Sequence, residues 1–136
     1  NRLDTFHELS LAALISRTLD PGGHLTAREL LALATCEGAR ALGLGATTGS
    51  LEPGKQADVI VVDHTAPHLA PNETLDPYTT LVYAARATDV RLTMVAGRIL
   101  YRTGTWTTLE PERVASEART EARGLVLRAG IGRAQG

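Results

Sequence analysis

The sequence predicts a mixed α/β protein in which helices come first, a few strands follow, and one helix closes the chain. Three observations support this order. Apolar residues recur with helical spacing in the N-terminal part, β-branched residues gather near position 60, and an apolar helical stripe follows Pro111. We expect residues 1–44, 45–109 and 110–136 to form separate structural regions.

The N-terminal region is expected to hold three helices. Asp4 can cap a long first helix, which is apolar on almost every side and therefore needs cover from more than one direction. Thr26 and Glu29 match a capping box that begins a second helix. Thr35 can cap a short third helix, which Gly43 would end in a left-handed conformation.

Strand signals begin after a glycine-rich loop. Residues 57–63 are rich in valine and isoleucine and are bounded by turn formers, so they predict a buried strand. Residues 90–95 and 98–101 predict two further strands, joined in a hairpin at Ala96 and Gly97. Three strands make a poor independent sheet, so this region is expected to need a partner that these residues do not supply.

The last element is expected to be a helix that begins near Pro111, a residue favoured at the first helical position. Val114, Ala118, Ala122 and Leu125 mark its apolar stripe. Two roles fit this stripe equally well: the contact of a homo-oligomer, or a cover for the helix's own subunit.

The composition excludes several classes of protein. A formal net charge of -1 gives no reason to expect nucleic acid or an anionic membrane as partner. No apolar run approaches the ~20 residues that cross a bilayer, and no secretory signal is visible. Cys36 is the single cysteine, which excludes an internal disulfide framework. We therefore expect a cytoplasmic protein, and the missing initiator methionine suggests that more chain lies upstream.

Few histidine, cysteine or acidic residues have the sequence spacing that a catalytic centre or a metal site requires. His64 and His68 are four residues apart, but Pro67 between them argues against a shared helical face, so we interpret them as loop histidines and not as a metal pair. Asp58 and Asp63 flank the predicted strand and point to opposite faces. Edge or turn roles are expected for them, not a joint role in acid–base catalysis.

The other candidate side chains are also interpreted as structural. His7 and His24 are expected at the surface or at an interface. Cys36 has no basic neighbour in the sequence that would lower its pKa, so it is expected to be a small buried side chain.

Several motifs resemble those of one enzyme family. Residues 49–63 resemble the C-terminal signature of the amidohydrolase superfamily, G-S-[IL]-x-x-G-K-x-A-D-[LIV]-[IV]-V-x-D. Residues 35–44 resemble its T-x-x-G-A-x-A-L-G-L helix, and residues 94–98 its V-x-G-[RK] hairpin. Residues 1–8 resemble the N-x-L-[DN]-x-F-x-E that opens the last barrel helix of the 5-methylthioadenosine/S-adenosylhomocysteine deaminases and related chlorohydrolases.

This resemblance implies a fold and a reaction. The chain would be the C-terminal fragment of a (β/α)8 barrel, contributing its last helices, plus strands of a small composite β-sandwich domain and a C-terminal helix. In the family a divalent metal, zinc or iron, activates the attacking water. The implied function is hydrolytic deamination of a purine nucleoside such as S-adenosylhomocysteine or methylthioadenosine. The alternatives are a chlorohydrolase, a guanine-type deaminase, or a non-catalytic α+β binding module.

The resemblance places no catalytic residue and no metal ligand in this segment. The family's metal-binding histidines, its acid–base Glu and its metal-binding Asp have no counterparts here, so the segment alone is expected to bind no metal and to be inactive. Asn1, Leu3 and Phe6 are expected at the edge of the substrate pocket. The implied partners are the N-terminal barrel portion of the same protein and a small-molecule substrate.

Overall fold

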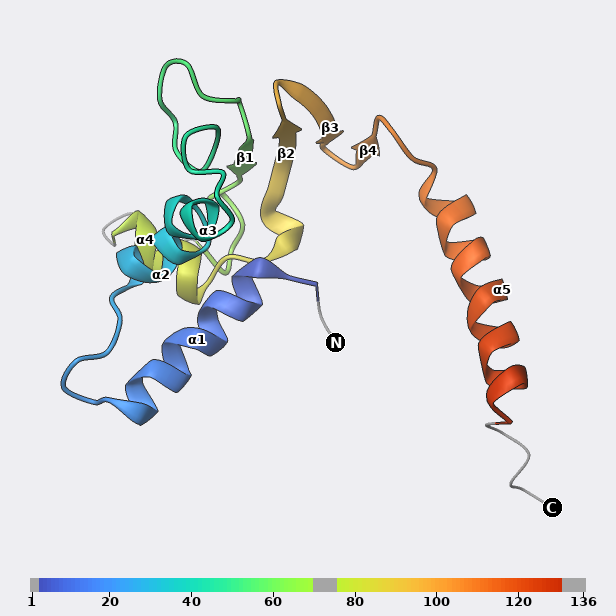
Figure 1. Cartoon of the computed structure of the whole chain (residues 1–136), viewed down its shortest axis with the longest axis horizontal. Helices are drawn as coiled ribbons and strands as arrows, with labels where there is room; N and C mark the ends of the chain where they lie inside the picture. Colours follow the sequence, from blue (N-terminus) through green and yellow to red (C-terminus); the bar gives the residue numbers. More distant parts are fainter. Residues whose placement is uncertain (1–2, 70–75, 131–136) are drawn as a thin grey trace. The chain divides into compact units, whose positions relative to one another are not determined.

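The structure is a computed structural model that describes residues 3–69 and 76–130 of the 136-residue chain. The chain divides into two compact units, Asn1–Gly104 and Thr105–Gly136, which are described separately. The elements in chain order are α1 (Thr5–Leu19), α2 (Ala27–Leu33), α3 (Cys36–Ala41), β1 (Val59–Val62), α4 (Pro77–Tyr83), the short 3-10 helix η2 (Ala87–Asp89), β2 (Val90–Val95), β3 (Arg98–Arg102), β4 (Thr105–Trp106) and α5 (Pro111–Ala129) (Figure 1).

Two of the three predicted N-terminal caps are confirmed. The Asp4 carboxylate accepts hydrogen bonds from two backbone N–H groups in the first turn of α1. Thr26 and Glu29 form the predicted capping box of α2. The predicted cap of α3 is wrong, because the Thr35 hydroxyl donates to the carbonyl of Leu31 at 2.7 Å and makes no capping bond to α3. That hydroxyl therefore extends α2 and does not begin α3.

Helices α1, α2 and α4 meet in a small apolar core of the first unit. Its buried members are Leu9 and Ala13 of α1, Leu30 of α2 and Val82 of α4. The spacing of Leu9 and Ala13, four residues apart, places both on one face of α1. The remaining faces of α1 take no part in this core.

Helix α4 is an element that the sequence analysis missed. Asp76 caps it by accepting from the backbone N–H of Thr79 at 3.2 Å, and Pro77 occupies its first position. Both signals are visible in the sequence, but a seven-residue helix is too short to show an apolar period. It nevertheless buries Thr80 and Val82, so it completes the core.

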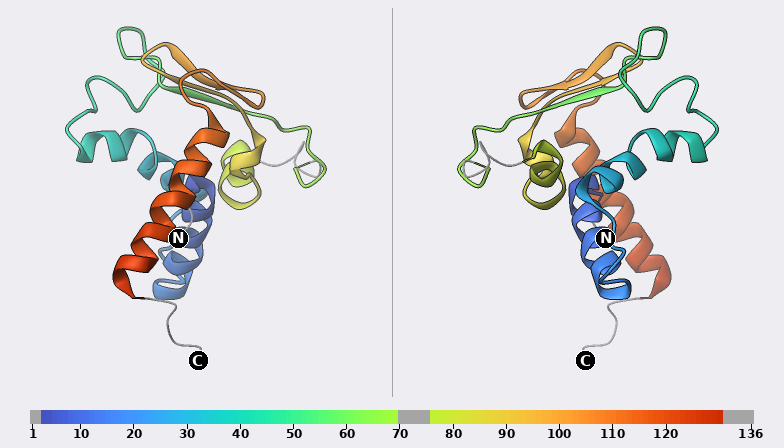
Figure 2. Two further views of the ribbon diagram at one scale, coloured as in Figure 1. Left: turned by 90° about the vertical axis from the view of Figure 1, so that its right-hand side faces the viewer. Right: turned by 90° about the vertical axis from the view of Figure 1, so that its left-hand side faces the viewer.

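The first unit also holds the antiparallel strands β1, β2 and β3, which are neighbours in that order (Figure 2). Val95 pairs with Arg98 across the turn between β2 and β3. The two turn residues, Ala96 and Gly97, both have positive φ, +48° and +77°. This is the backbone that two-residue hairpins favour, and it confirms the predicted hairpin.

Strand β1 is confirmed as a strand, but the prediction that it is buried is wrong. Ile60 is 51% exposed and Val61 is 49% exposed. Successive side chains of a strand point to opposite faces of the sheet, so the exposure of Ile60 and Val61 means that neither face of β1 is fully covered. Helix α1 likewise leaves Leu11, Leu14 and Ile15 exposed, so the chain does not cover all its apolar surface.

The second unit consists of β4 and the predicted helix α5. Pro111 occupies the first turn of α5, and Gly130 ends it with a left-handed φ of +66°. Within residues 3–69 and 76–130, no helix combines the length and the hydropathy that a bilayer span requires. The whole is a mixed α/β structure with a small antiparallel sheet, as the sequence predicted.

Candidate functional site

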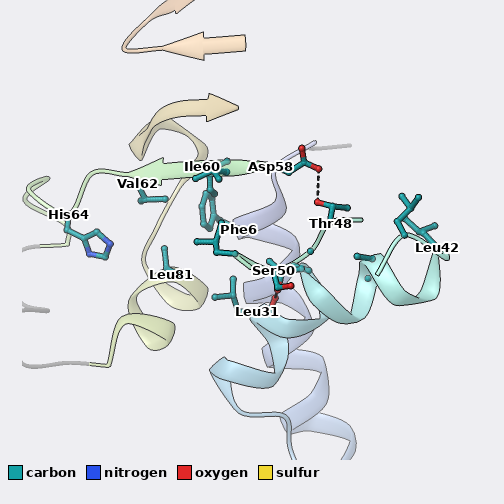
Figure 3. Close-up of a pocket in the computed structure, with 18 residues that line it drawn as sticks. Phe6, Leu31, Leu42, Thr48, Ser50, Asp58, Ile60, Val62, His64 and Leu81 are labelled. Carbon is teal, nitrogen blue, oxygen red and sulfur yellow. Dashed lines mark hydrogen bonds between the residues drawn. The ribbon is translucent and has the colours of Figure 1, made fainter. Parts of the chain in front are cut away.

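A pocket of about 730 Å³ lies in the first unit between β1 and helices α2, α3 and α4. Figure 3 shows its apolar walls, with Ile60 and Val62 of β1 on one side and Leu31 and Leu81 of the helices on the other. Phe6 of α1 also lines it. Walls of this kind suit an apolar group. Most polar side chains of the pocket lie in the segments that flank β1, and Thr35 lies between α2 and α3.

Asp58 lies just before β1 and joins two segments beside the pocket. Its carboxylate accepts from the hydroxyl of Thr48 at 2.7 Å and from the backbone N–H of Ala96 at 2.6 Å (Figure 3 shows the Thr48 bond). The bond from Ala96, and then the bond from Thr48, lower the pKa of Asp58. Asp58 therefore holds the loop before β1 against the hairpin turn, which confirms the turn role predicted for it.

Asp63 follows the other end of β1 and binds different partners. It accepts from the hydroxyl of Thr65 at 2.7 Å and from its backbone N–H at 2.8 Å, and from Arg91 of β2 at 2.8 Å. The Thr65 hydroxyl is the largest of the causes that lower the pKa of Asp63 to about 2. The two carboxylates thus serve separate structural contacts and do not form an acid–base pair.

The loop between α3 and β1 is held by its own polar side chains. Lys55 Nζ donates to Ser50 Oγ at 2.6 Å and lies 3.3 Å from Glu52 Oε1. Ser50 Oγ donates in turn to the Glu52 carboxylate, and this bond is the largest cause of the lowered pKa of Glu52. These polar atoms bind one another, so the loop forms a defined wall of the pocket.

Gly49 allows this loop to approach α3 closely. Its φ of +95° lies in the region that favours glycine. A Cβ atom here would lie 2.6 Å from the Cβ of Ala39 and 3.1 Å from the Cα of Cys36. Both the backbone conformation and the packing therefore require glycine at the start of the 49–63 motif.

The two histidines after β1 lie in a loop, as predicted, and have different surroundings. His64 lines the 730 Å³ pocket. His68 Nε2 lies 3.0 Å from Oδ2 of Asp89, a buried carboxylate that also accepts from the backbone N–H of Arg86 at 2.8 Å. This contact ties the loop to the residues just before β2. No local sequence pattern indicates this contact, since the partners are 21 residues apart.

The other predicted polar side chains are spread through the first unit. His7 is exposed and lines a second hollow of about 630 Å³ together with His68 and Arg86. His24 is exposed in the turn between α1 and α2, as predicted. Cys36 is half-buried, so its expected burial is only partial.

The divalent metal that the resemblance implies does not fit the residues described here. In the described ranges, no three His, Cys, Asp or Glu side chains come together in a group that could hold a metal ion. Asp58 and Asp63 already accept hydrogen bonds from two or more donors. A structural or catalytic zinc site needs three or four convergent protein ligands. No chemical step is therefore assigned to a metal on these residues.

The three residues predicted at the edge of a substrate pocket have different positions. Phe6 is 7% exposed and lines the 730 Å³ pocket. Leu3 precedes α1 and its side chain is fully exposed. Asn1 lies outside the described residues. Their contact with a substrate stays a prediction.

Residues 1–100 match the amidohydrolase family. The chain is 45% identical over 131 residues to a 5'-deoxyadenosine deaminase of Methanosarcina acetivorans, which covers 95% of this chain and 29% of that protein. It is 41% identical over 125 residues to a 5-methylthioadenosine/S-adenosylhomocysteine deaminase of Syntrophobacter fumaroxidans, covering 90% of this chain and 28% of that protein. The chain thus spans less than a third of the length of these curated relatives.

The chain is also similar to solved structures of a deaminase and a chlorohydrolase. An adenosine deaminase from Xanthomonas campestris with bound zinc superimposes with a TM-score of 0.79 at 31% identity, over 85% of this chain and 26% of that one. An atrazine chlorohydrolase from Arthrobacter aurescens, complexed with zinc, superimposes with a TM-score of 0.75 at 29% identity, over 85% of this chain and 25% of that one.

Proposed function

The chain belongs to the amidohydrolase family, and from that premise we propose that it is the C-terminal part of a metal-dependent enzyme that hydrolytically deaminates a purine nucleoside. S-adenosylhomocysteine and methylthioadenosine are the substrates that the proposal names. The observation that carries it is the identity of 41–45% to two adenosine-type deaminases over at least 90% of the chain.

In this proposal residues 1–44 are the last helices of the catalytic barrel, residues 45–109 are part of a composite β-domain, and residues 110–136 form the C-terminal helix and tail. Two observations support the proposal that another portion of the protein packs against this chain. Helix α1 exposes Leu14 and Ile15 outside its core face, and β1 exposes Ile60. The N-terminal barrel portion of the same protein would cover these side chains and pair with the outer edge of β1.

The catalytic ion belongs to the remainder of the enzyme in this proposal. The two superimposed structures carry zinc, and such an ion supplies an activated water when bound. The residues of this chain would not bind the ion; they would shape the substrate pocket and hold its loops in place. Asn1, Leu3 and Phe6 would border the substrate, while Gly49 and Asp58 would hold the loop of the 49–63 motif in place.

The test is the reaction of the full-length protein that contains this chain. We expect release of ammonia from S-adenosylhomocysteine, methylthioadenosine or 5'-deoxyadenosine, with loss of activity on chelation and recovery on addition of zinc. The chlorohydrolase-like structural neighbour defines the second candidate. Release of chloride from a chlorinated triazine without ammonia would replace the deaminase proposal with that one, and deamination of guanine alone would move the protein to the guanine-type deaminases.

A Phe6→Leu variant of the full-length protein tests the assignment of the pocket edge. If Phe6 borders the substrate, we expect a several-fold higher KM, accompanied by a loss of stability of about 1 kcal/mol because Phe6 is buried. Leu31→Ala is the matched control, since Leu31 lines the same pocket from α2 and has no proposed substrate contact. Similar changes of KM in both variants would contradict the assignment.

A further inference from the structure

The second hollow of the first unit, of about 630 Å³, is lined by polar side chains from three separate segments. His7 and Ser10 line it from α1, His68 from the loop after β1, and Arg86 from the connection between α4 and η2. We call it the polar hollow. It is formed within one unit of the chain, and its volume lies within the range of about 300 to 1,000 Å³ that is typical of small-molecule pockets.

The base of the polar hollow is apolar and well packed. Phe6, Val82 and Ala85 line it and are 7%, 1% and 9% exposed. Val82 also belongs to the core of helices α1, α2 and α4. The base is therefore held by the packing of the fold, and it offers a surface on which an apolar group can lie.

His68 is held in a fixed orientation beside this base. Its Nε2 lies 3.0 Å from Oδ2 of Asp89, a carboxylate that is 6% exposed and that also accepts from the backbone N–H of Arg86 at 2.8 Å. An ionised carboxylate only accepts hydrogen bonds, so Nε2 is the donor. Asp89 can therefore balance a positive charge on the His68 ring, which a bound anion would favour.

Arg86 supplies a cationic group without a carboxylate partner. Within residues 3–69 and 76–130 it forms no ion pair. Other arginines of this unit are engaged, since Arg17 lies over the ring of Tyr83 and Arg91 binds Asp63. A guanidinium presents several N–H donors in a plane and suits the oxygen atoms of a phosphate or a carboxylate.

The polar hollow is also lined by one carboxylate, that of Asp4. Its Oδ1 atom accepts from the backbone N–H groups of Phe6 at 3.1 Å and His7 at 3.4 Å. These bonds and the N-terminal end of α1 offset its negative charge. The groups that remain to bind a ligand are thus mostly donors and potential cations: Arg86, His7 and His68.

The exposed side chains around the polar hollow differ from the surfaces that we assign to the barrel portion. His7, Tyr83, Arg86 and Thr88 are exposed and polar, whereas β1 exposes Ile60. Covering charged and polar groups with an apolar partner costs free energy, because they lose their hydrogen bonds to water. We therefore expect the polar hollow to stay open to water in the complete protein.

We propose that the polar hollow binds a small molecule that carries an oxyanion, a phosphate or a carboxylate, on an apolar body. Arg86, His68 and His7 bind the oxyanion, and the apolar body lies on Phe6 and Val82. This binding does not depend on the deaminase reaction. Failure to release ammonia would leave it untouched, and failure to bind an oxyanion would leave the deaminase proposal untouched.

The first test adds inorganic phosphate, phenyl phosphate or acetate, in separate samples, to the full-length protein that contains this chain. The histidine rings carry 13C, NMR records their signals at constant pH and ionic strength, and single His→Asn variants assign the four histidines of this chain. We expect the His7 and His68 signals to shift with one common dissociation constant. The His24 and His64 signals should stay in place, since neither side chain lines the polar hollow.

The three probes identify the ligand class. Shifts with phosphate alone identify a phosphate ligand, and shifts with acetate alone identify a carboxylate ligand. Phenyl phosphate is expected to bind at least about threefold more tightly than inorganic phosphate, because its ring covers the apolar base. Absence of a shift at His7 and His68 with all three probes overturns the proposal. Equal shifts of all four signals also overturn it, because they would indicate a non-specific effect of the salt.

The second test compares Arg86→Gln with Arg98→Gln in the same protein. Arg86→Gln removes the guanidinium but keeps the backbone N–H that binds Asp89, and Arg98 is an exposed arginine of β3 outside the polar hollow. We expect Arg86→Gln to weaken phosphate binding at least about tenfold and Arg98→Gln less than about twofold. Thermal unfolding checks that both variants are folded. Equal effects on binding would show that phosphate does not bind at Arg86, which overturns the proposal.

Discussion

The first unit contains two apolar regions that differ in how completely the chain fills them. Where α1, α2 and α4 meet, Leu30 is 0% exposed and Val82 is 1% exposed. Where β1 faces α2 and α3, a pocket of about 730 Å³ remains and Ile60 is half exposed. Side-chain burial stabilises the first region. In the second, hydrogen bonds from Asp58 and the close approach at Gly49 fix the backbone, and the apolar surface stays open.

The largest effect that tests this contrast is expected from Leu30→Ala. Removing a fully buried leucine from the helix core should lower the free energy of unfolding by about 3 kcal/mol. Leu33→Ala, on the same helix but 51% exposed, should lower it by less than about 1 kcal/mol. Urea unfolding followed by circular dichroism measures both. Equal losses would mean that the three-helix core does not dominate the stability of this unit.

The next effect concerns the loop that closes one side of the pocket. Gly49→Ala should destabilise by about 2 to 3 kcal/mol, because the new Cβ meets Ala39 and the backbone has positive φ. Gly54 has a similar φ of +93° but nothing within 4 Å of a Cβ. Gly54→Ala should therefore show the conformational part alone, about 1 kcal/mol. The difference between the melting temperatures of the two variants measures the cost of the clash with Ala39. Identical melting temperatures would show that the loop moves away from α3 and relieves the clash.

The difference between the filled helix core and the open region beside β1 also separates the features of the fold that the sequence predicts from those that it does not. Local signals were sufficient for most elements: the caps at Asp4 and Thr26, the hairpin at Ala96 and Gly97, and Pro111 at the start of α5. These depend on residues that lie close together in the chain. The burial of β1 was predicted wrongly, because apolar composition shows what a strand can bury and not which surface is present to cover it.

The candidate site was predictable only in part, for a related reason. The 49–63 motif identifies the loop and the strand that border the pocket, but the pocket also needs Leu81 of α4, a helix without an apolar period. The contact of His68 with Asp89 and the bond from Asp58 to Ala96 join residues 21 and 38 positions apart. Such contacts follow from the pairing of β1 with β2, which no local pattern specifies.

A smaller effect, at the end of β1 away from Asp58, should depend on pH. The folded pKa of Asp63 is about 2, below its ordinary value of 3.8, because Thr65 and Arg91 bind the ionised carboxylate. A lowered folded pKa stabilises the fold above the unfolded pKa, and this contribution is lost as the pH falls from about 4 to about 2. Asp63→Asn should therefore lose less stability than the parent chain over that range.

Thermal unfolding at pH 7, 4, 3 and 2 measures this difference. Thr65→Val is the matched variant, since it removes the hydroxyl bond that contributes most to the pKa and keeps the Arg91 contact. Its pH dependence should lie between those of the parent and Asp63→Asn. Parallel curves for all three chains would show that Asp63 is not held ionised by these partners.

The smallest effect in this chain is expected at Ile60, and it decides whether the open region awaits a partner. Ile60 is 51% exposed, so Ile60→Thr should change the unfolding free energy of the chain by no more than about 0.5 kcal/mol. In the full-length protein of our proposal the barrel portion covers β1, and the same substitution should then destabilise by about 1 to 2 kcal/mol. Leu30→Ala should cost about the same in both proteins, because its core is already complete within this chain. Only a difference confined to Ile60 would show that the two apolar regions differ because one of them is shared with another part of the protein.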